Sequence, residues 1–487
     1  MRVLFVTSEM APWVKTGGLG DVAAALPAAL RAQGHDVKVL LPYYPALRAA
    51  FPDAPTRTHI VWLGGAFPEP HLREAEGPDG VPLLLIDHGP YYDRPGNPYV
   101  GPGNQDWPDN AMRFGLLGRV AALLGAAHSP LDWRPDILHC NDWQAGLAPV
   151  FLSERPDAVA RSVMTVHNLA FQGVFGREML APLGLPDHLW RMDGLEYHGL
   201  LSFLKAGLQF ADRITTVSPT YAREISTDAE GMGLAGLLRH RADRLSGILN
   251  GIDATVWNPV DDPLLPAHFS AAAPEGKATC KAAVQAEMGL EEREDLPLFA
   301  VVSRLTYQKG LDLLPGLERL FAELPAQLAV LGSGESGLEG ALRAMAARNP
   351  GRIAARIGFD EGLAHRIEAG SDVFMIPSRF EPCGLNQMYS LRYGTLPLVR
   401  ATGGLADTVR DYGAPGDEAR GANGFVFGPA TGEALAETIR RAVAAWKDPP
   451  SWRRIQANGM AADYSWAGPA YRYGEVYAAA LGGRDGR

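Results

Sequence analysis

A chain of 487 residues exceeds what one hydrophobic core usually serves, so the sequence predicts two large domains. Its formal net charge of −10 argues against nucleic acid as a partner, although a local basic cluster can still bind a small phosphate ligand. The 3 cysteines lie far apart with no CxxC pair, which indicates neither a disulfide framework nor a zinc site and favours a cytoplasmic location. No apolar run approaches the roughly 18 residues that span a bilayer, and the N-terminal run VLFV is shorter than the apolar part of a signal peptide. We therefore expect neither export nor a membrane partner.

The first half of the chain alternates short apolar strands with helical segments. Residues 2–9, RVLFVTSE, have the pattern of a buried strand, residues 20–35 that of a helix, and residues 36–45 that of the next strand. This βαβ pattern indicates a parallel sheet. Further apolar strands that end in polar residues are predicted at 135–142, 161–168 and 212–219. The ends of such strands are where ligand sites of α/β folds form.

The periodicity lapses into proline, alanine and glycine over residues 258–280, which we interpret as an interdomain segment. A second βαβ series follows, with strands predicted at 296–305, 326–335, 352–359, 372–379 and 395–402. The sequence therefore predicts an α/β fold of two doubly wound domains. We place an N-terminal domain at 1–255, a C-terminal domain at 256–460, and a terminal helix within 461–487 that packs back on the first domain.

The segment KTGGLGDV, which begins at Lys15, places three glycines at the turn where the first predicted strand leads into the first predicted helix. Backbone N–H groups and a helix N-terminus at such a turn favour an anion such as phosphate. The segment is not a P-loop, because its lysine precedes the glycines instead of following them. Residues 18–23 match the GxGxxA dinucleotide fingerprint, but Asp36 lies at the beginning of the second strand and not at its end, which disfavours an NAD enzyme. A purely structural turn stays open for the glycines but does not explain Lys15.

Other polar residues also follow predicted strand ends. Arg304 and Lys309 could face one cleft, or they could be ordinary solvated charges. Glu381 precedes a helix whose first turn would offer N–H groups near Cys383, Gly384 and Leu385 to an anion. The alternative is that this glutamate only stabilises the helix dipole.

A second group of polar and aromatic residues follows strand ends in the first half. His167 and Asn168 end one predicted strand, and Asp142 and Trp143 follow another. Aromatic and amide groups at such places suit a sugar, through stacking and hydrogen bonds to hydroxyls. Each residue alone is more often structural than functional, and their clustering favours a function.

Together, the motifs resemble those of the bacterial glycogen synthases and plant starch synthases. The resemblance rests on an ordered set that spans nearly the whole chain: KTGGLGDV, HCNDWQAGL, TVHNLAFQG, ILNGID, VSRLTYQKGLDLL, EPCGLNQMYSLRYGTLP and TGGLADTV. It implies two Rossmann-like domains facing a central cleft, the GT-B arrangement, with the acceptor on the N-terminal side and the donor on the C-terminal side. It also implies a retaining transfer of glucose from ADP-glucose to the non-reducing end of an α-1,4-glucan, without a cofactor.

The resemblance assigns roles to residues of this chain by motif matching. The residues implied for catalysis are Lys15, His167, Arg304, Lys309 and Glu381. The residues implied for substrate binding are Lys15, Gly18, Asp21, Asp142, Asn168, Asn250, Phe359, Cys383, Gly384 and Leu385. No metal is expected, because no Asp/Glu cluster with ligand spacing occurs and three basic side chains can neutralise a diphosphate.

Three departures from the family pattern bear on single contacts. Phe171 and Phe359 stand where such enzymes often carry tyrosine, which keeps the ring and loses a hydroxyl. Stacking of Phe359 on adenine is still expected, and a hydroxyl bond there is not. Asn386 stands where threonine is common, which puts one side-chain contact in doubt.

The expected mechanism differs from that of a glycosidase, which needs two carboxylates flanking the bond. A diphosphate already leaves readily, so stabilisation of its negative charge should dominate. In the family's front-face reaction a phosphate oxygen takes the acceptor's proton, and His167 would act through its backbone carbonyl. Two alternatives stay open: a related transferase that uses a UDP-sugar or another acceptor, and a glucan-binding protein without activity.

Overall fold

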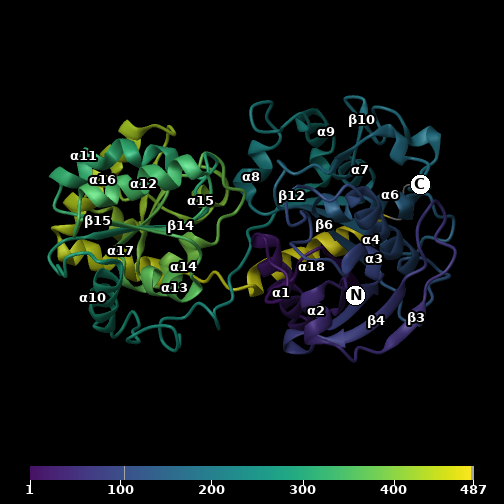
Figure 1. Ribbon diagram of the computed structural model, residues 1–487, viewed down its shortest axis with the longest axis horizontal. Coiled ribbons are helices and arrows are strands. Elements are labelled where there is room, and N and C mark those ends of the chain that lie inside the picture. The colour runs from purple at the N-terminus through teal and green to yellow at the C-terminus, as the bar shows by residue number, and fades with distance from the viewer. Residues whose placement is uncertain (104, 484–487) are drawn as a thin grey trace. The chain divides into compact units, whose positions relative to one another are not determined.

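The structure is a computed structural model that describes residues 1–103 and 105–483 (Figure 1). The chain divides into two compact units. The first comprises Met1–Gly251 and the C-terminal segment that begins at Trp466, and the second comprises Ile252–Ser465. Among the described residues, no helix has the length and apolar character needed to cross a bilayer.

The first unit is built on one large sheet. Its strands, in order across the sheet, are β12 (Leu245–Gly247), β11 (Arg213–Thr216), β7 (Arg161–Val166), β6 (Ile137–Asn141), β1 (Arg2–Val6), β2 (Asp36–Pro42), β5 (Pro82–Asp87), β4 (His71–Glu76) and β3 (Thr56–His59). The strands from β12 to β5 are parallel, as the βαβ pattern predicts. Central strands β1 and β6 are almost wholly buried, which is typical of parallel strands covered on both faces.

Two parts of this unit were not predicted. Strands β4 and β3 extend the sheet in antiparallel fashion, and a small antiparallel sheet joins β8 (Val174–Phe175), β10 (Leu200–Ser202) and β9 (Glu196–Tyr197). Strand β4, HLREAE, holds a single buried leucine, and the three strands of the small sheet have two or three residues each. Segments that are this polar or this short do not show a strand period.

Helices cover the first sheet. They are α1 (Gly18–Ala32), α2 (Pro45–Ala50), α3 (Gly89–Tyr92), α4 (Asn110–Leu124), α5 (Asp142–Ala145), α6 (Leu147–Ser153), α7 (Phe203–Phe210), α8 (Pro219–Glu224), α9 (Ala235–His240) and the terminal α18 (Ala467–Gly482). Helix α18 makes one buried and one exposed polar contact with the rest of this unit. The Tyr477 hydroxyl lies 2.7 Å from His139 Nδ1 on β6, and Gln33 Nε2 donates to the Ala467 carbonyl over 2.7 Å.

The second unit has a parallel sheet with helices on both faces. Its strand order is β15 (Ile353–Ile357), β14 (Gln327–Gly332), β13 (Leu298–Val302), β16 (Val373–Ile376), β17 (Leu396–Arg400) and β18 (Phe425–Phe427). Its helices are α10 (Gly276–Met288), α11 (Glu318–Glu323), α12 (Ser336–Arg348), α13 (Glu361–Gly370), α14 (Asn386–Arg392), α15 (Gly403–Thr408), α16 (Gly432–Trp446) and α17 (Pro449–Met460). The fold class expected from the sequence is therefore confirmed in each unit.

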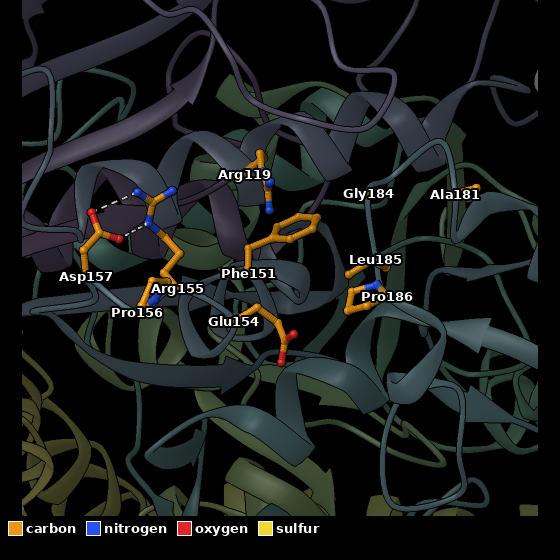
Figure 2. A pocket seen from close by; sticks show the side chains of 10 residues that line it. All are labelled: Arg119, Phe151, Glu154, Arg155, Pro156, Asp157, Ala181, Gly184, Leu185 and Pro186. Atoms are coloured by element: carbon orange, nitrogen blue, oxygen red, sulfur yellow. Dashed lines mark hydrogen bonds and ion pairs between the residues drawn. The ribbon is translucent and has the colours of Figure 1, made fainter.

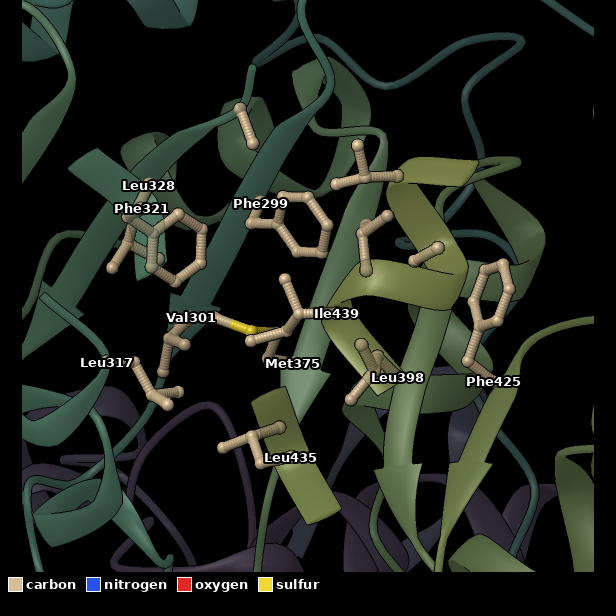
Figure 3. Packing of buried hydrophobic residues seen from close by; sticks show 14 of the residues in the cluster. Phe299, Val301, Leu317, Phe321, Leu328, Met375, Leu398, Phe425, Leu435 and Ile439 are labelled. Carbon is tan, nitrogen blue, oxygen red and sulfur yellow. The ribbon is translucent and has the colours of Figure 1, made fainter. Parts of the chain in front are cut away.

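Alternate residues of the second sheet belong to two separate cores. Phe299 and Val301 of β13 pack with Leu435 and Ile439 of α16 in one buried cluster, whose members come together in Figure 3. The intervening residue Ala300 belongs to a different cluster on the other face. This alternation follows from the two-residue period of a strand. Replacing Phe299 by alanine would remove a fully buried ring and destabilise the unit by about 3–5 kcal/mol.

Residues 258–280 are not a free interdomain segment, which corrects our prediction. They lie within the second unit, and Asp262 is 2% exposed. Its Oδ2 atom accepts hydrogen bonds from Tyr393 and the His365 ring, each over 2.7 Å. Just before the segment, the Trp257 ring stacks on His365 at a centroid distance of 3.8 Å. Proline and glycine interrupt the helical period here, which is why the sequence looked like a linker. The hydrogen bonds of one buried carboxylate nevertheless hold the segment in place.

Candidate active site

The candidate residues of both units follow the carboxyl ends of parallel strands. In the first unit the segments that follow β1, β6, β7 and β12 contain Lys15, Gly18, Asp21, Asp142, His167, Asn168 and Asn250. In the second unit the sites after β13, β15 and β16 carry Arg304, Lys309, Phe359, Glu381, Cys383, Gly384 and Leu385. Strand β1 lies beside β6 in the first sheet, and β13 lies beside β16 in the second. At these two places the order in which successive strands are added to the sheet reverses. Ligands of doubly wound folds bind at such switch points.

The glycine loop leads from β1 into α1. Lys15 is half exposed, and its Nζ atom lies 2.8 Å from Asp21 Oδ1, so two candidate residues pair with each other. A β-carbon on Gly17 or Gly18 would meet open space, whereas one on Gly20 would approach the Lys15 side chain. The surface beside Gly17 and Gly18 is therefore low enough for a ligand to approach the backbone.

Asp142 joins the ends of β6 and β7. Its backbone has a φ of 53°, an uncommon value for a residue other than glycine, and its side chain is buried. Oδ1 accepts a hydrogen bond from the His167 backbone N–H over 2.7 Å and a longer one from Asn168 over 3.4 Å. Burial raises the pKa of Asp142 to about 7, and the charge of nearby Glu9 adds to this rise. The carboxyl group can therefore change protonation near neutral pH.

His167 is a neutral imidazole with a defined tautomer. Asn141 Nδ2 donates to the Val6 carbonyl over 3.0 Å, so Asn141 Oδ1 is an acceptor and His167 Nε2, at 2.9 Å, carries the hydrogen. The lone pair of His167 then lies on Nδ1. Burial lowers the pKa of His167 to about 3, so the ring stays uncharged at neutral pH. It can accept a hydrogen bond from a hydroxyl but cannot act as a cationic acid.

The residues near this site differ in what they can offer a sugar. Asn250 is buried, and its Oδ1 atom has no hydrogen-bond partner within the described part of the chain. Such an atom is one of the few buried polar groups left for a ligand to satisfy. Asn168 Oδ1 instead accepts from the Ala170 N–H over 3.0 Å. Phe171 is 55% exposed on the following loop.

Trp143 is not available for stacking on a sugar, which corrects our interpretation. The ring is buried and packs edge-on against Phe114, with centroids 4.9 Å apart. Gly173 lies so close that a β-carbon there would overlap the indole. The side chain belongs to an aromatic core beneath the strand ends, which the sequence pattern alone could not separate from a surface ring.

In the second unit, Lys309 and Glu381 meet across the switch point. Lys309 Nζ lies 2.6 Å from Glu381 Oε2, and Ser378 Oγ donates to the same oxygen over 2.8 Å. Both charged side chains are largely buried, at 19% and 10% exposure. Glu381 thus has Lys309 and Ser378 as side-chain partners, and helix α14 begins further along the chain, at Asn386. Arg304 lies exposed on the same loop as Lys309.

The loop from Cys383 to Leu385 needs its glycine. Gly384 has a φ of 70°, and a β-carbon on it would collide with the Gln387 side chain. Helix α15 packs closely against the same loop, because a β-carbon on Gly404 would overlap the Cys383 carbonyl oxygen. Asn386, the residue that departs from the family pattern, donates from Nδ2 to the Val302 carbonyl over 3.0 Å and ties the loop to β13.

Phe359 stands apart from these buried groups. It follows β15, directly after Gly358, and is 82% exposed. Such a ring presents a large apolar surface to solvent, and stacking would cover it.

A separate pocket of about 670 Å³ lies in the first unit (Figure 2). It is lined by Arg119, Phe151, Glu154, Arg155, Pro156, Asp157, Ala181, Gly184, Leu185 and Pro186. Arg155 and Asp157 pair with each other there and precede the amino end of β7. The pocket contains none of the candidate residues. The described residues also hold no group of three or more His, Cys, Asp or Glu side chains placed to bind a metal ion.

Comparisons with known proteins connect this geometry to a family. The starch synthase catalytic domain family matches residues 2–240, and the family of glycosyl transferases group 1 matches residues 287–459. The glycogen synthase of Dechloromonas aromatica is 58% identical over 484 residues, which cover 99% of each chain. The chain belongs to the glycogen synthase family. It is therefore a retaining glucosyltransferase, and the function expected from the resemblance is confirmed at this level.

Further relatives support the same assignment. The glycogen synthase of Nitrosospira multiformis is 50% identical over 99% of this chain and 97% of its own. The catalytic domain of starch synthase IV from Arabidopsis thaliana, solved with ADP and acarbose, has a TM-score of 0.88 at 32% identity and covers 99% of both chains. A sucrose-phosphate synthase from Thermosynechococcus elongatus, at 18% identity and a TM-score of 0.60, shares the fold. The GT-B class is thus confirmed.

Proposed function

We propose that the chain takes ADP-glucose as donor and extends the non-reducing end of an α-1,4-glucan. The observation that carries the proposal is the Lys309–Glu381 pair at the switch point of the second sheet. It sets a cation, which suits a phosphate, beside a carboxylate, which suits sugar hydroxyls. The starch synthase IV structure was solved with ADP, which supports an adenine nucleotide as donor.

In this proposal the second unit holds the donor. Arg304 and Lys309 bear on the diphosphate, and Glu381 accepts hydrogen bonds from the glucose hydroxyls. The N–H groups of Cys383, Gly384 and Leu385 take part in the same anion pocket. Phe359 stacks on adenine, because its exposed ring gains by being covered.

The first unit supplies the glycine loop and the sugar-facing groups. Lys15 contacts the diphosphate, which requires its ammonium to exchange Asp21 for a phosphate oxygen or to bind both. Gly18 leaves room for the donor to approach the backbone. Asp142, His167, Asn168 and Asn250 line the glucose site. His167 Nδ1 accepts a hydroxyl hydrogen, and the His167 carbonyl faces the anomeric carbon.

The chemistry then rests on charge stabilisation. As the glycosidic bond to the diphosphate breaks, negative charge grows on the leaving group and positive charge on the sugar ring. The basic side chains stabilise the negative charge on the leaving group, because charge–charge interactions are strong in a partly desolvated site. A phosphate oxygen accepts the proton of the attacking hydroxyl, and the new bond forms on the same face. No protein nucleophile is required.

The donor assignment is tested by one assay. The purified protein is incubated with glycogen and either ADP-glucose or UDP-glucose, and nucleoside diphosphate release and glucan growth are measured. We expect turnover with ADP-glucose and at least tenfold lower kcat/KM with UDP-glucose. Turnover with UDP-glucose alone would show a different donor, and glycogen binding with no release from either would show an inactive glucan-binding protein.

The role of Lys15 is tested by Lys15→Gln. The lysine should act on bound donor and on the more negative leaving group, so KM for ADP-glucose should rise and kcat should fall. A charge-assisted contact of this kind corresponds to about 2–4 kcal/mol in kcat/KM, or roughly thirty-fold to a thousand-fold. Lys447→Gln, at an exposed position after α16, is the matched control. Unchanged constants in Lys15→Gln would make Lys15 an ordinary solvated residue.

A further inference from the structure

Glu9 is a buried acidic residue that no motif singled out. It lies three residues beyond the end of β1 and is 3% exposed. Its Oε2 atom accepts a hydrogen bond from the Thr16 backbone N–H over 2.6 Å, and its Oε1 atom accepts one from Thr16 Oγ1, also over 2.6 Å. The Tyr99 hydroxyl donates to Oε1 as well. One carboxylate therefore gathers three donors from two separate segments.

The Glu9–Thr16 contact closes the loop that carries Lys15. Within this loop, Met10 and Val14 exchange two backbone hydrogen bonds of 2.9 Å each. Thr16 directly follows Lys15 and precedes Gly17, the residue before α1. Lys15 is thus held on both sides, by the Met10–Val14 bridge before it and by Glu9 after it.

Tyr99 gives the carboxylate a second fixed support. Its carbonyl accepts from Asn110 Nδ2 of α4 over 2.9 Å, and its hydroxyl lies 2.9 Å from Ser8 Oγ. The adjoining Pro98 carbonyl accepts from Arg113 over 2.8 Å, and Arg113 is 1% exposed. The contacts form a continuous path from a buried helix to the glycine loop.

The Glu9 anchor adds to two backbone ties of the loop, the Met10–Val14 bridge and the hydrogen bond of 3.0 Å from the Ala11 N–H to the Gly20 carbonyl, and it acts directly beside two glycines. Gly17 and Gly18 have no side chains, and the space beside them is open. Glycines also have the largest conformational freedom to lose on ordering. A catalytic group displaced by about 1 Å can lose on the order of a hundredfold in rate, so the anchor bears directly on Lys15.

We infer that Glu9 is a positioning residue, which fixes Thr16 and thereby sets Lys15 for the diphosphate of the donor. The inference rests on the proposed role of Lys15. Glu9 itself touches neither donor nor acceptor. Its removal should therefore act on the donor constants and not on the glucan constants.

The test is a double-mutant cycle of Glu9→Ala and Lys15→Gln, with KM for ADP-glucose, KM for glycogen and kcat measured in all four proteins. Glu9→Ala alone should lower kcat/KM for the donor by about ten- to a hundredfold and leave the glycogen KM within twofold. In the Lys15→Gln background the same change should lower kcat/KM by less than twofold, because the residue it positions is already gone.

Two variants keep the test informative if Glu9→Ala folds poorly. Glu9→Gln keeps an acceptor for the Thr16 N–H and offers an NH₂ to the two hydroxyls, so donor kcat/KM should stay within about threefold of the wild type. Thr16→Val removes only the hydroxyl bond and should give a smaller effect of the same kind. Glu74→Ala, on strand β4 between β5 and β3, is the control for loss of a glutamate in the same unit.

The outcomes separate the inference from the proposed function. Losses that multiply in the double mutant would overturn the positioning role while leaving the role of Lys15 intact. An equal rise of both KM values in Glu9→Ala would likewise make Glu9 a general structural residue. Wild-type constants in Lys15→Gln would refute the proposed role of Lys15 and the inference together, whereas the donor assignment itself fails only in the comparison of ADP-glucose with UDP-glucose.

Discussion

Asp142→Asn should stabilise the first unit at alkaline pH and lower activity. The carboxyl group has an ordinary pKa of 3.8 in the unfolded chain and about 7 in the folded protein, where burial raises it. Below pH 3.8 the group is protonated in both states and folding carries no penalty. Between the two values only the unfolded chain loses the proton, so stability falls as the pH rises. Above pH 7 the penalty is complete, about 4 kcal/mol for roughly 3 pKa units.

Asparagine does not ionise and escapes this penalty. It keeps an oxygen for the His167 N–H, and it tolerates the positive φ at this position. Its NH₂ group replaces Oδ2 in a buried place and would itself cost about 1–3 kcal/mol if unpaired. The free energy of unfolding of the variant should therefore increase relative to that of the wild type by about 2.5 kcal/mol between pH 5 and pH 8.

The assay is urea unfolding at both pH values, monitored through the hydrogen exchange of residues 137–153. A local readout is needed because a chain of two units need not unfold in one step. Asp212→Asn is the control, since Asp212 accepts from the Ser162 N–H over 2.9 Å but also pairs with Arg161, and its loss should destabilise at both pH values. If Asp142→Asn changes the free energy of unfolding by the same amount at pH 5 and pH 8, burial does not hold this carboxyl group protonated.

Four further outcomes follow from the structure and the proposed function. Tyr477→Phe should destabilise the first unit by about 1–3 kcal/mol by leaving the buried His139 nitrogen unpaired, whereas Tyr471→Phe, 63% exposed on the same helix, should change it little in urea unfolding. Burial lowers the pKa values of His139 and His167 to about 3, so both rings bind a proton more readily in the unfolded chain than in the folded protein. The free energy of unfolding should therefore fall as the pH drops from 6.5 towards 3 in the same assay. Activity should survive EDTA; a loss that Mg²⁺ restores would contradict the metal-free mechanism. Donor contacts in both units predict a smaller radius of gyration with ADP in solution scattering, and an unchanged profile at saturation would argue against closure.

The strands and the sheet edge that carries the site could be predicted because buried parallel strands are rich in apolar residues and end in polar ones. RVLFV, ILHCN and LFAVV are short segments rich in apolar residues, and each leads into a polar loop. Strand order, however, is not written in any local pattern. Lys309 and Glu381 are 72 residues apart, and their contact depends on β13 lying beside β16. Only the family resemblance brought them into one site in advance.

The errors have local physical causes. A buried tryptophan and one that stacks on a sugar have the same sequence signal, an aromatic residue after a strand. For Trp143, only its aromatic neighbours in space show that it is buried. Residues 258–280 lack helical period, yet Asp262 fixes them through partners more than a hundred residues away. Glu9 could have been noticed as an acidic residue after a buried strand, but its partner Tyr99 lies 90 residues further along the chain.

The same desolvation acts on both titratable groups at the β6–β7 strand ends. It raises the pKa of Asp142 to about 7 and lowers that of His167 to about 3, so in each case burial favours the uncharged form. A protonated His167 would repel the positive charge that grows on the sugar ring, and its low pKa prevents this. Asp142 can supply negative charge there once it ionises, while its acceptor oxygen keeps the His167 backbone in place in either form. In the proposed reaction these groups therefore act on the sugar, and the departing diphosphate is left to the lysine and arginine side chains. Activity should then rise with pH through about 7, and Asp142→Asn should remove that step from the pH profile of kcat.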